Sequence, residues 1–484
     1  MTTIIDDRNK AFAGAAKPAP SLRWTLASLS LSMLMPSLDT SIANVGLPTL
    51  AQAFGASFQD VQWIVLAYLL AITTLIVSVG RLGDILGRRR LLLAGICLFT
   101  LASLLCGLAP WLWLLIAARA AQGLGAAIMM ASTVALASET VGKARTGSAM
   151  GLLGTMSAIG TTLGPSLGGI LIAGFGWQVI FLVNLPLGIL NFLLAWRHVP
   201  ADRREPKVGW PGFDAIGTLL LALTLVAYAL AMTMGRGSFG TLNIALLLTA
   251  AIGTGLFIVA QSRAASPLLR LAMFRDARLS AGLAMSVLVS TVIMATLVVG
   301  PFYLSRALGL GPALVGLTMS TGPLVAALTG VPAGRIVDRF GAHRMTIIGL
   351  IGMAAGLSAL AALPGSFGVA GYIAPLVIVT ASYALFQAAN NTTIMTDVRP
   401  DQRGVISGML SLSRNLGLIT GASFMGAVFA LASAADDIMT AHPQAIATGM
   451  WITFAGAAGL IVVAMVIAVG GRAIATRSSP AGEG

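Results

Sequence analysis

The sequence predicts an all-α integral membrane protein. Of its 484 residues, 57% are hydrophobic and 9% are charged, and the mean hydropathy is +0.92. A water-soluble domain carries about 25% charged residues. Apolar runs recur along almost the whole chain, and many reach the roughly 20 residues that a helix needs to cross a bilayer. They are too long for the strands of a membrane barrel, which alternate over about ten residues.

Gly, Pro and charge clusters divide these runs into about fourteen expected spans. We expect two six-helix bundles, at 22–200 and 278–471, with two additional central helices at 213–262. Residues 1–21 and 472–484 are expected to be tails, and the polar start lacks the pattern of a cleavable signal peptide. The expected spans are 22–47, 61–80, 91–109, 111–134, 148–173, 178–196, 213–235, 241–261, 278–303, 312–333, 345–363, 370–394, 404–432 and 448–470.

The basic residues predict the orientation. Of 29 Lys and Arg, all but four fall in the tails or in alternate loops; the exceptions are Arg236 and Arg306 in opposite loops and Arg119 and Arg414 in spans. Loops rich in Lys and Arg stay in the cytoplasm, so both termini are expected there. The net charge of +13 then reflects topology and contact with anionic lipid. Nucleic-acid binding would need these charges on one soluble domain.

An internal repeat indicates two parallel halves. The loop "GRLGDILGRRR" at 80–90 returns as "GRIVDRFGAHR" at 334–344, each between the second and third span of its half. Parallel halves that rock about a central site are typical of transporters. Glycines let helix ends approach closely, and an Asp can pair with an Arg or a helix N-terminus. We interpret the loops as a conformational latch; the alternative is a basic loop that only sets topology. The latch residues are Gly80, Arg81, Gly83, Asp84, Gly87, Arg88, Arg90, Arg335, Asp338, Gly341 and Arg344.

Two charged residues lie inside expected spans. Asp39 is in "MPSLDTSIANVGLP" and Arg119 in "AARAAQGLGAA", although a charge at the bilayer centre costs roughly 3 kcal/mol or more. Pro36 leaves the carbonyl of Ser32 without its helical donor, which makes the surroundings of Asp39 polar. Burial favours the protonated acid and a nearby guanidinium favours the carboxylate, so such a site can load and release a proton. We therefore assign both residues to proton coupling. The alternatives are a structural carboxylate at the Pro36 break and a snorkelling arginine.

A glycine stripe marks the fifth span. In "GTTLGPSLGG", Gly160, Gly164 and Gly168 recur every four residues around Pro165, followed by Gly169. This spacing allows close helix packing, and the proline favours a bend. The motif indicates a helix that moves; ordinary packing is the alternative.

Polar and aromatic residues within the spans are candidates for a substrate cavity. Interhelical hydrogen bonding is the alternative for the amides near residue 390, and pairing with backbone carbonyls is the alternative for the arginine at 414. The candidates are Asn44, Trp63, Tyr68, Gln122, Gln387, Asn390, Asn391 and Arg414.

The sequence indicates no cofactor. His198, His343 and His442 are far apart, and no GxxxxGK[ST] phosphate loop occurs. No nucleophile, base and metal constellation indicates an enzyme. We therefore expect no metal site, and a proton gradient as the energy source.

Together these motifs resemble the major facilitator superfamily, and specifically its fourteen-span drug/proton antiporters, over nearly the whole chain. "LDTSIANVGLP" resembles the first-helix motif, with Asp39, Asn44 and Pro48 in place, and "GRLGDILGRRR" resembles the superfamily's loop motif. "RAAQG" is similar to the fourth-helix motif, "GTTLGPSLGG" to the fifth-helix motif of antiporters and "QWIVLAYLLA" to the second helix. The resemblance implies proton or cation coupling at Asp39, proton transfer or conformational coupling at Arg119, and helix movement at the Gly-Pro stripe.

Two features depart from that branch. Trp177-Gln178 stands where the branch often has Trp-Arg, and the spans lack the extra acids of members that export multivalent cations. We expect a proton-coupled antiporter that works by alternating access in a bacterial inner membrane. It would export amphipathic drugs, dyes or antiseptics, monocationic or neutral rather than dicationic, as a lipid-embedded monomer without nucleic-acid partners. The alternatives are a facilitator or symporter for a specific metabolite, or a membrane-embedded binding or signalling protein.

Overall fold

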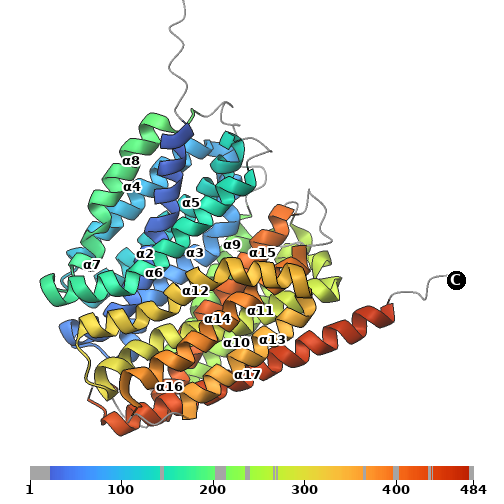
Figure 1. Ribbon diagram of the computed structural model, residues 1–484. Coiled ribbons are helices and arrows are strands. Elements are labelled where there is room, and N and C mark those ends of the chain that lie inside the picture. The colour runs from blue at the N-terminus through green and yellow to red at the C-terminus, as the bar shows by residue number, and fades with distance from the viewer. Residues whose placement is uncertain are drawn as a thin grey trace, which may run out of the picture.

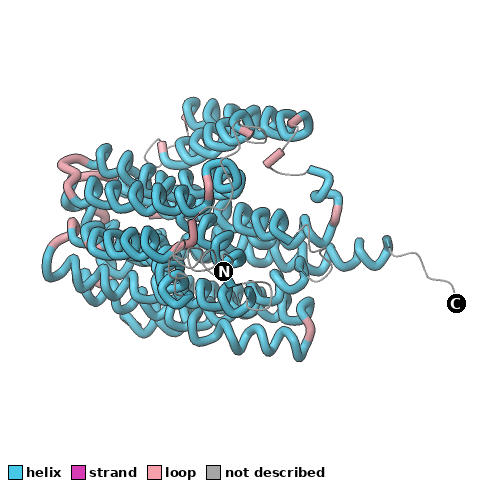
Figure 2. Tube along the Cα trace, turned by 90° about the horizontal axis from the view of Figure 1, so that it is seen from above, coloured by secondary structure: helices cyan, strands magenta, loops and turns pink. Residues whose placement is uncertain are grey.

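The computed structural model is entirely helical in the part of the chain that it describes (Figure 2). Long helices joined by short turns satisfy their backbone hydrogen bonds internally, as a bilayer requires. The described residues are 22–141, 146–201, 214–234, 240–264, 267–268, 271–362, 367–395, 403–433, 438 and 440–478.

The first half forms one bundle of helices, upright in Figure 1. Its sixth span is divided at Val183, three residues before Pro186, whose ring removes a backbone donor from the helix. The division leaves Val179–His198 as one segment long and apolar enough to cross a membrane, as the sequence predicted with a span at 178–196. The helices are α2 (Leu22–Phe54), α3 (Phe58–Leu86), α4 (Arg88–Gly107), α5 (Leu112–Val141), α6 (Thr146–Phe175), α7 (Val179–Leu182) and α8 (Asn184–His198).

The two additional helices, α9 (Ala215–Thr233) and α10 (Thr241–Arg263), pack against each other. Of the two, α9 contacts α3 of the first half and also the π-helical turn η5 (Gly421–Met425) of the second half. The pair therefore lies against both halves at their junction.

The second half forms the other bundle, inclined to the first in Figure 1. Two of its spans contain a π-helical turn that the sequence reading did not anticipate. The last helix continues past residue 471, where we expected the bundle to end. The helices are α11 (Ala277–Phe302) with η3 (Tyr303–Ala307), α12 (Pro312–Phe340), α13 (Ala342–Ala362), α14 (Gly368–Met395), α15 (Arg403–Thr420) with η5 and α16 (Gly426–Ala432), and α17 (Pro443–Ser478); a short 3-10 helix, η2 (Leu271–Arg275), precedes them.

Thirteen segments within the described helices are long and apolar enough to cross a membrane. The helix α2 is not among them because it is rich in polar residues, and it buries them inside the bundle: Thr25, Ser28, Ser30, Ser32, Asp39, Ser41 and Asn44. With α2, the helices make up the fourteen spans expected from the sequence. The protein is an all-α, multi-pass membrane protein.

The sequence repeat corresponds to a repeated turn. Gly87, between α3 and α4, has φ 93°, and Gly341, between α12 and α13, has φ 87°. Their amides donate to the oxygens of Gly83 (3.1 Å) and Val337 (2.9 Å). A positive φ suits glycine because it has no Cβ. The repeated glycines therefore allow the same tight connection in both halves.

The two halves meet closely along α6 and α12. A Cβ added at Gly169 would lie 2.5 Å from the Pro312 carbonyl oxygen, and one added at Gly316 would lie 2.2 Å from that of Pro165. The Thr162 hydroxyl donates to the Pro323 carbonyl, 3.1 Å away. Small residues thus bring the two backbones into contact toward the end at which α2 finishes.

Candidate functional site

Asp39 lies in the middle of α2 and is completely buried. Pro36 precedes it by one turn, and the Pro36 carbonyl accepts hydrogen bonds from the hydroxyls of Thr40 (2.8 Å) and Tyr68 (3.2 Å). The sequence predicted a polar environment at this proline from the Ser32 carbonyl. The polar contacts that the structure describes there are instead hydroxyls of two helices, bonded to the Pro36 carbonyl.

Arg119 on α5 supplies the counter-ion. Its Nη1 donates to Asp39 Oδ2, and both side chains are buried. Its Nε donates to the Ile64 carbonyl on α3 (3.1 Å), and its guanidinium lies over the Tyr68 ring, 4.2 Å from the centroid. Phe181 on α7 lies farther off, with its centroid 5.7 Å away. Arg119 is therefore an internal residue of the first bundle and not a snorkelling anchor.

Two amides complete the hydrogen bonding of the carboxylate. Gln122 Nε2 and Asn184 Nδ2 each donate to Asp39 Oδ1 at 2.8 Å. Gln122 also accepts from Arg119 Nη1 (2.6 Å) and donates to the Ser103 hydroxyl on α4 (2.8 Å). The Asp39 cluster, defined as Asp39, Arg119, Gln122 and Asn184, is fully buried.

Glycines next to Gln122 allow this convergence of helices. A Cβ at Gly123 would lie 2.5 Å from the Tyr68 carbonyl oxygen on α3, and one at Gly125 would lie 2.7 Å from the Phe99 amide nitrogen on α4. Helix α5 therefore packs backbone to backbone against two neighbours. This close packing sets Arg119 and Gln122 within reach of α2.

The glycine stripe of α6 packs on α2 next to Asp39. Added Cβ atoms would lie 2.6 Å from the Leu34 carbonyl oxygen at Gly160, 1.9 Å from Ser41 Oγ at Gly164 and 2.6 Å from Ile42 Cγ1 at Gly168. Ser41 and Ile42 follow Asp39 by two and three residues. Gly169 and the Pro165 carbonyl face α12 instead. The motif therefore has two packing surfaces, one for each half.

The latch residues lie where the repeat predicts, at the turns between α3 and α4 and between α12 and α13. In the first loop Gly83 is buried, and Arg88 Nη1 pairs with Glu139 Oε1 of α5 at 2.7 Å. Arg90 is exposed, and so are Arg335, Asp338 and Arg344 of the second loop. The side chains of Gly80, Arg81 and Asp84 are outside the described part of the structure.

Several expected cavity residues serve other contacts. Tyr68 and Gln122 are buried in or against the Asp39 cluster. Trp63 donates from Nε1 to the Thr233 hydroxyl of α9 (3.1 Å), and Asn390 donates to the Gly282 carbonyl of α11 (3.1 Å). Trp63 and Asn390 therefore each hold a neighbouring helix by a hydrogen bond. For Asn390 this is the interhelical bonding that the sequence offered as the alternative to a cavity role.

Four other cavity candidates make no such hydrogen bond within the described part of the chain. Asn44 is buried, and neither polar atom of its amide has a hydrogen-bond partner among the described residues. Gln387 is half-buried on α14, and Asn391 on the same helix is exposed. Arg414 on α15 is exposed and lies within electrostatic reach of the Tyr383 hydroxyl.

Three members of the site were missed by sequence reasoning: Asn184, Ser103 and the Ile64 carbonyl. Asn184 had a recognisable signal, because it is an amide inside an apolar run, two residues before Pro186. The helix division at Val183 places it at the first position of α8, facing Asp39. The backbone carbonyl of Ile64 leaves no mark in the sequence.

Comparison with known proteins agrees with the fold. Residues 29–422 match the family model described as Major Facilitator Superfamily. The chain belongs to the major facilitator superfamily. It is similar to the multidrug resistance protein Stp of Mycobacterium tuberculosis, with 34% identity over 412 residues, covering 84% of this chain and 75% of that protein. It is also similar to the riboflavin transporter RibZ of Clostridioides difficile, with 30% identity over 424 residues, covering 87% and 92%.

A solved structure of the superfamily shows the same fold. A bacterial homologue of the human lysosomal transporter Spinster, in an inward-facing, unoccupied conformation, superposes with a TM-score of 0.71 at 16% identity, covering 96% of this chain and all of that one. As a superfamily member, the chain is a membrane-embedded transporter of small molecules, not an enzyme. The sequence-based recognition of the superfamily is confirmed.

Proposed function

We propose that this major facilitator exports amphipathic compounds from a bacterial cell by exchanging them for protons, with both termini in the cytoplasm. Alternating access to a central site between the two halves would carry out the exchange. The name of its relative Stp, a multidrug resistance protein, supports export of drugs. The single observation that carries proton coupling is the Asp39 cluster.

The cluster holds a carboxylate where protonation would have a large effect. Asp39 is bonded to Arg119 on α5, and to Gln122 and Asn184 on α5 and α8. Because the cluster is buried, these groups fix both the charge and the position of the acid. A proton on Asp39 removes the negative charge and weakens its bonds to two other helices.

Arg119 has partners that remain when Asp39 is protonated. The Ile64 carbonyl and Gln122 Oε1 accept from it, and the Tyr68 ring lies beneath it. None of these three depends on the charge of Asp39. The guanidinium can therefore stay buried in both protonation states, at a smaller cost than an isolated buried charge.

Packing contacts lead from the cluster to the interface between the halves. The glycine stripe of α6 packs against α2 at Ser41 and Ile42, and Gly169 of α6 packs against α12. A shift of α2 after protonation would be passed to α6 because interiors this tightly packed move as discrete units. This route supports coupling between the proton site and the opening of the halves.

The proton gradient supplies sufficient energy. A potential of 100 mV contributes about 2.3 kcal/mol per charge and one pH unit about 1.4 kcal/mol. One inward proton can therefore sustain an outward substrate ratio on the order of 100 or more.

The second candidate is a facilitator or symporter for a specific metabolite. Its support is the riboflavin transporter RibZ, which matches at 30% identity over most of both chains. Such a protein would move its substrate without substrate-driven proton countertransport.

Gradient-driven transport in proteoliposomes distinguishes these functions. We expect wild type to accumulate a fluorescent amphiphile in vesicles with an acidic lumen, with simultaneous alkalinisation of the lumen, whereas a symporter would acidify the lumen. The Asp39→Asn variant should lose accumulation but keep exchange of labelled for unlabelled substrate, and Asp39→Glu should retain part of both. Full accumulation by Asp39→Asn would remove Asp39 from coupling; substrate flux without proton flux in wild type would favour the facilitator.

A further inference from the structure

Arg414 is a charged residue exposed inside a span. It lies eleven residues after the start of α15, or about 16 Å along the helix axis, within the apolar segment Gly408–Ala432. Counted from the start of that segment, it lies six residues, or about 9 Å, deep. A guanidinium facing lipid there would be costly, and arginines inside spans almost always face the bundle interior or water. Helix α15 lies between α11 and α3 of the other half, at the junction of the two bundles.

One polar side chain of the second half is near this arginine. Tyr383 of α14 is within its electrostatic reach, and Gln387 follows Tyr383 by one helical turn, half-buried. No carboxylate pairs with Arg414 among the described residues. Its exposed charge thus has no carboxylate counter-ion in this part of the chain.

The acids whose side chains the structure describes are placed elsewhere. Asp39 is buried and paired, and Glu139 is paired with Arg88 at the end of α5. The others lie in the first or last turn of a helix or at its N-cap: Asp60, Asp214, Asp276 and Asp338. Within the described spans, no acid is therefore available to receive a cationic substrate.

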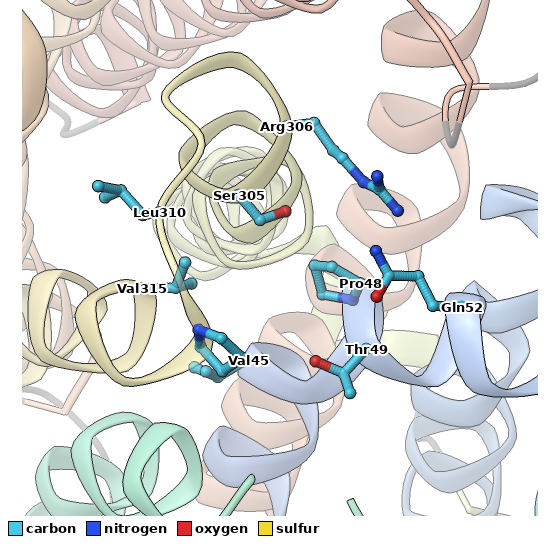
Figure 3. Close-up of a pocket in the computed structure, with 9 residues that line it drawn as sticks. Val45, Pro48, Thr49, Gln52, Ser305, Arg306, Leu310 and Val315 are labelled. Carbon is cyan, nitrogen blue, oxygen red and sulfur yellow. The ribbon is translucent and has the colours of Figure 1, made fainter. Parts of the chain in front are cut away.

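A small pocket at the other end of the junction has the same sign of charge. It lies between α2, η3 and the start of α12, with a volume of about 120 Å³. Figure 3 shows Gln52 and Arg306 extending toward one another across it. Its lining includes Thr49 and Ser305 but no acid. The charged residue that lines this pocket, Arg306, is thus basic, as Arg414 is on α15.

We infer that this transporter selects amphipathic anions, an aromatic carboxylate, sulfonate or phenolate, with Arg414 binding the negative group. This inference rests on the proposed export function and differs from the monocationic preference expected from the sequence. Guanidinium pairs strongly with oxyanions, and a cation would be repelled by Arg414. Because Asp39 is buried away from Arg414, the substrate and the proton compete through the conformational equilibrium rather than for one carboxylate.

Two dyes of nearly the same shape provide the test. 8-Anilinonaphthalene-1-sulfonate is an anion, N-phenyl-1-naphthylamine is its neutral counterpart, and ethidium serves as the cation. In proteoliposomes of phosphatidylcholine, we expect wild type to transport the sulfonate fastest. Arg414→Gln should reduce its transport and binding by about tenfold or more, and Arg414→Lys should restore most of it. Arg275→Gln, which removes an exposed charge outside the spans, should have no effect.

The outcomes separate the inference from the proposed export. Proton-driven export of ethidium that equals or exceeds that of the sulfonate and is unchanged in Arg414→Gln would overturn the inference and leave export intact. Sulfonate binding that requires Arg414, without accumulation against a gradient, would support the inference and refute export. Loss of sulfonate binding when phosphatidylglycerol is added would assign the anion site to a lipid headgroup and overturn the substrate reading.

Discussion

The Arg119 guanidinium donates directly to the Asp39 carboxylate in the interior of the first bundle, although the two residues are 80 positions apart in the chain. Both side chains are shielded from solvent. An ion pair of this kind contributes little net stability, but removing one partner leaves a buried charge and typically costs about 3–5 kcal/mol.

A double-mutant cycle measures this pair. We expect Asp39→Asn and Arg119→Gln each to lower the unfolding midpoint of the purified protein, because each leaves a buried charge unpaired. The double variant should be more stable than the sum of the two effects predicts, with a coupling of about 1–3 kcal/mol. Additive effects would show that the two groups do not interact in solution.

Asn184 holds the carboxylate from α8. Asn184→Leu removes one of the hydrogen bonds to Asp39 Oδ1 while leaving the Asp39–Arg119 pair in place. We expect a loss of about 1.5–3 kcal/mol, typical of a hydrogen bond to a charged group, and weaker proton-driven transport. Asn191→Leu is the control, since Asn191 is equally buried on the same helix but bonds Ser28 and Ser32 instead of Asp39. A fall in proton coupling in both variants would contradict a specific role for Asn184.

The contact of α6 with α12 should respond to a single methyl group. Gly316→Ala would place Cβ 2.2 Å from the Pro165 carbonyl oxygen, and such overpacking costs about 1–3 kcal/mol. We expect the halves to separate at this end. In a Cys97→Ser background, a cysteine at Thr49 in the adjacent pocket should react faster with a charged maleimide.

Gly330→Ala is the matched control for that experiment, because a Cβ on the same helix α12 at this position meets nothing within 4 Å. It should leave the labelling rate unchanged. Equal rates in wild type and Gly316→Ala would mean that this glycine contact does not hold the halves together.

The repeated turn should require glycine. Gly341→Ala forces a side chain into a conformation with φ 87°, at a cost of about 1–2 kcal/mol. Gly334→Ala, within α12 and without close neighbours, should be tolerated. Thermal unfolding of both variants tests this; an unaltered midpoint for Gly341→Ala would show that the turn adapts.

Composition and repeats were sufficient to predict the fold, because burial in a bilayer leaves a strong periodic signal of length and apolarity. Single charges in spans, Asp39 and Arg119, also predicted a site, since each needs a partner or a use. The sequence could not show that they pair, because that depends on glycine-mediated packing of helices far apart in the chain. It also could not separate Trp63 and Asn390, which bond neighbouring helices, from Arg414, which remains exposed.

The most direct test of the account is proton release on substrate binding. The purified protein in weakly buffered solution, at a series of pH values, is mixed with the dye that proteoliposomes transport best, and the proton change is recorded for wild type and Asp39→Asn. We expect wild type to release protons in proportion to bound dye and Asp39→Asn to bind dye without release. Equal release by both proteins would contradict the assignment of Asp39 as the proton-carrying group.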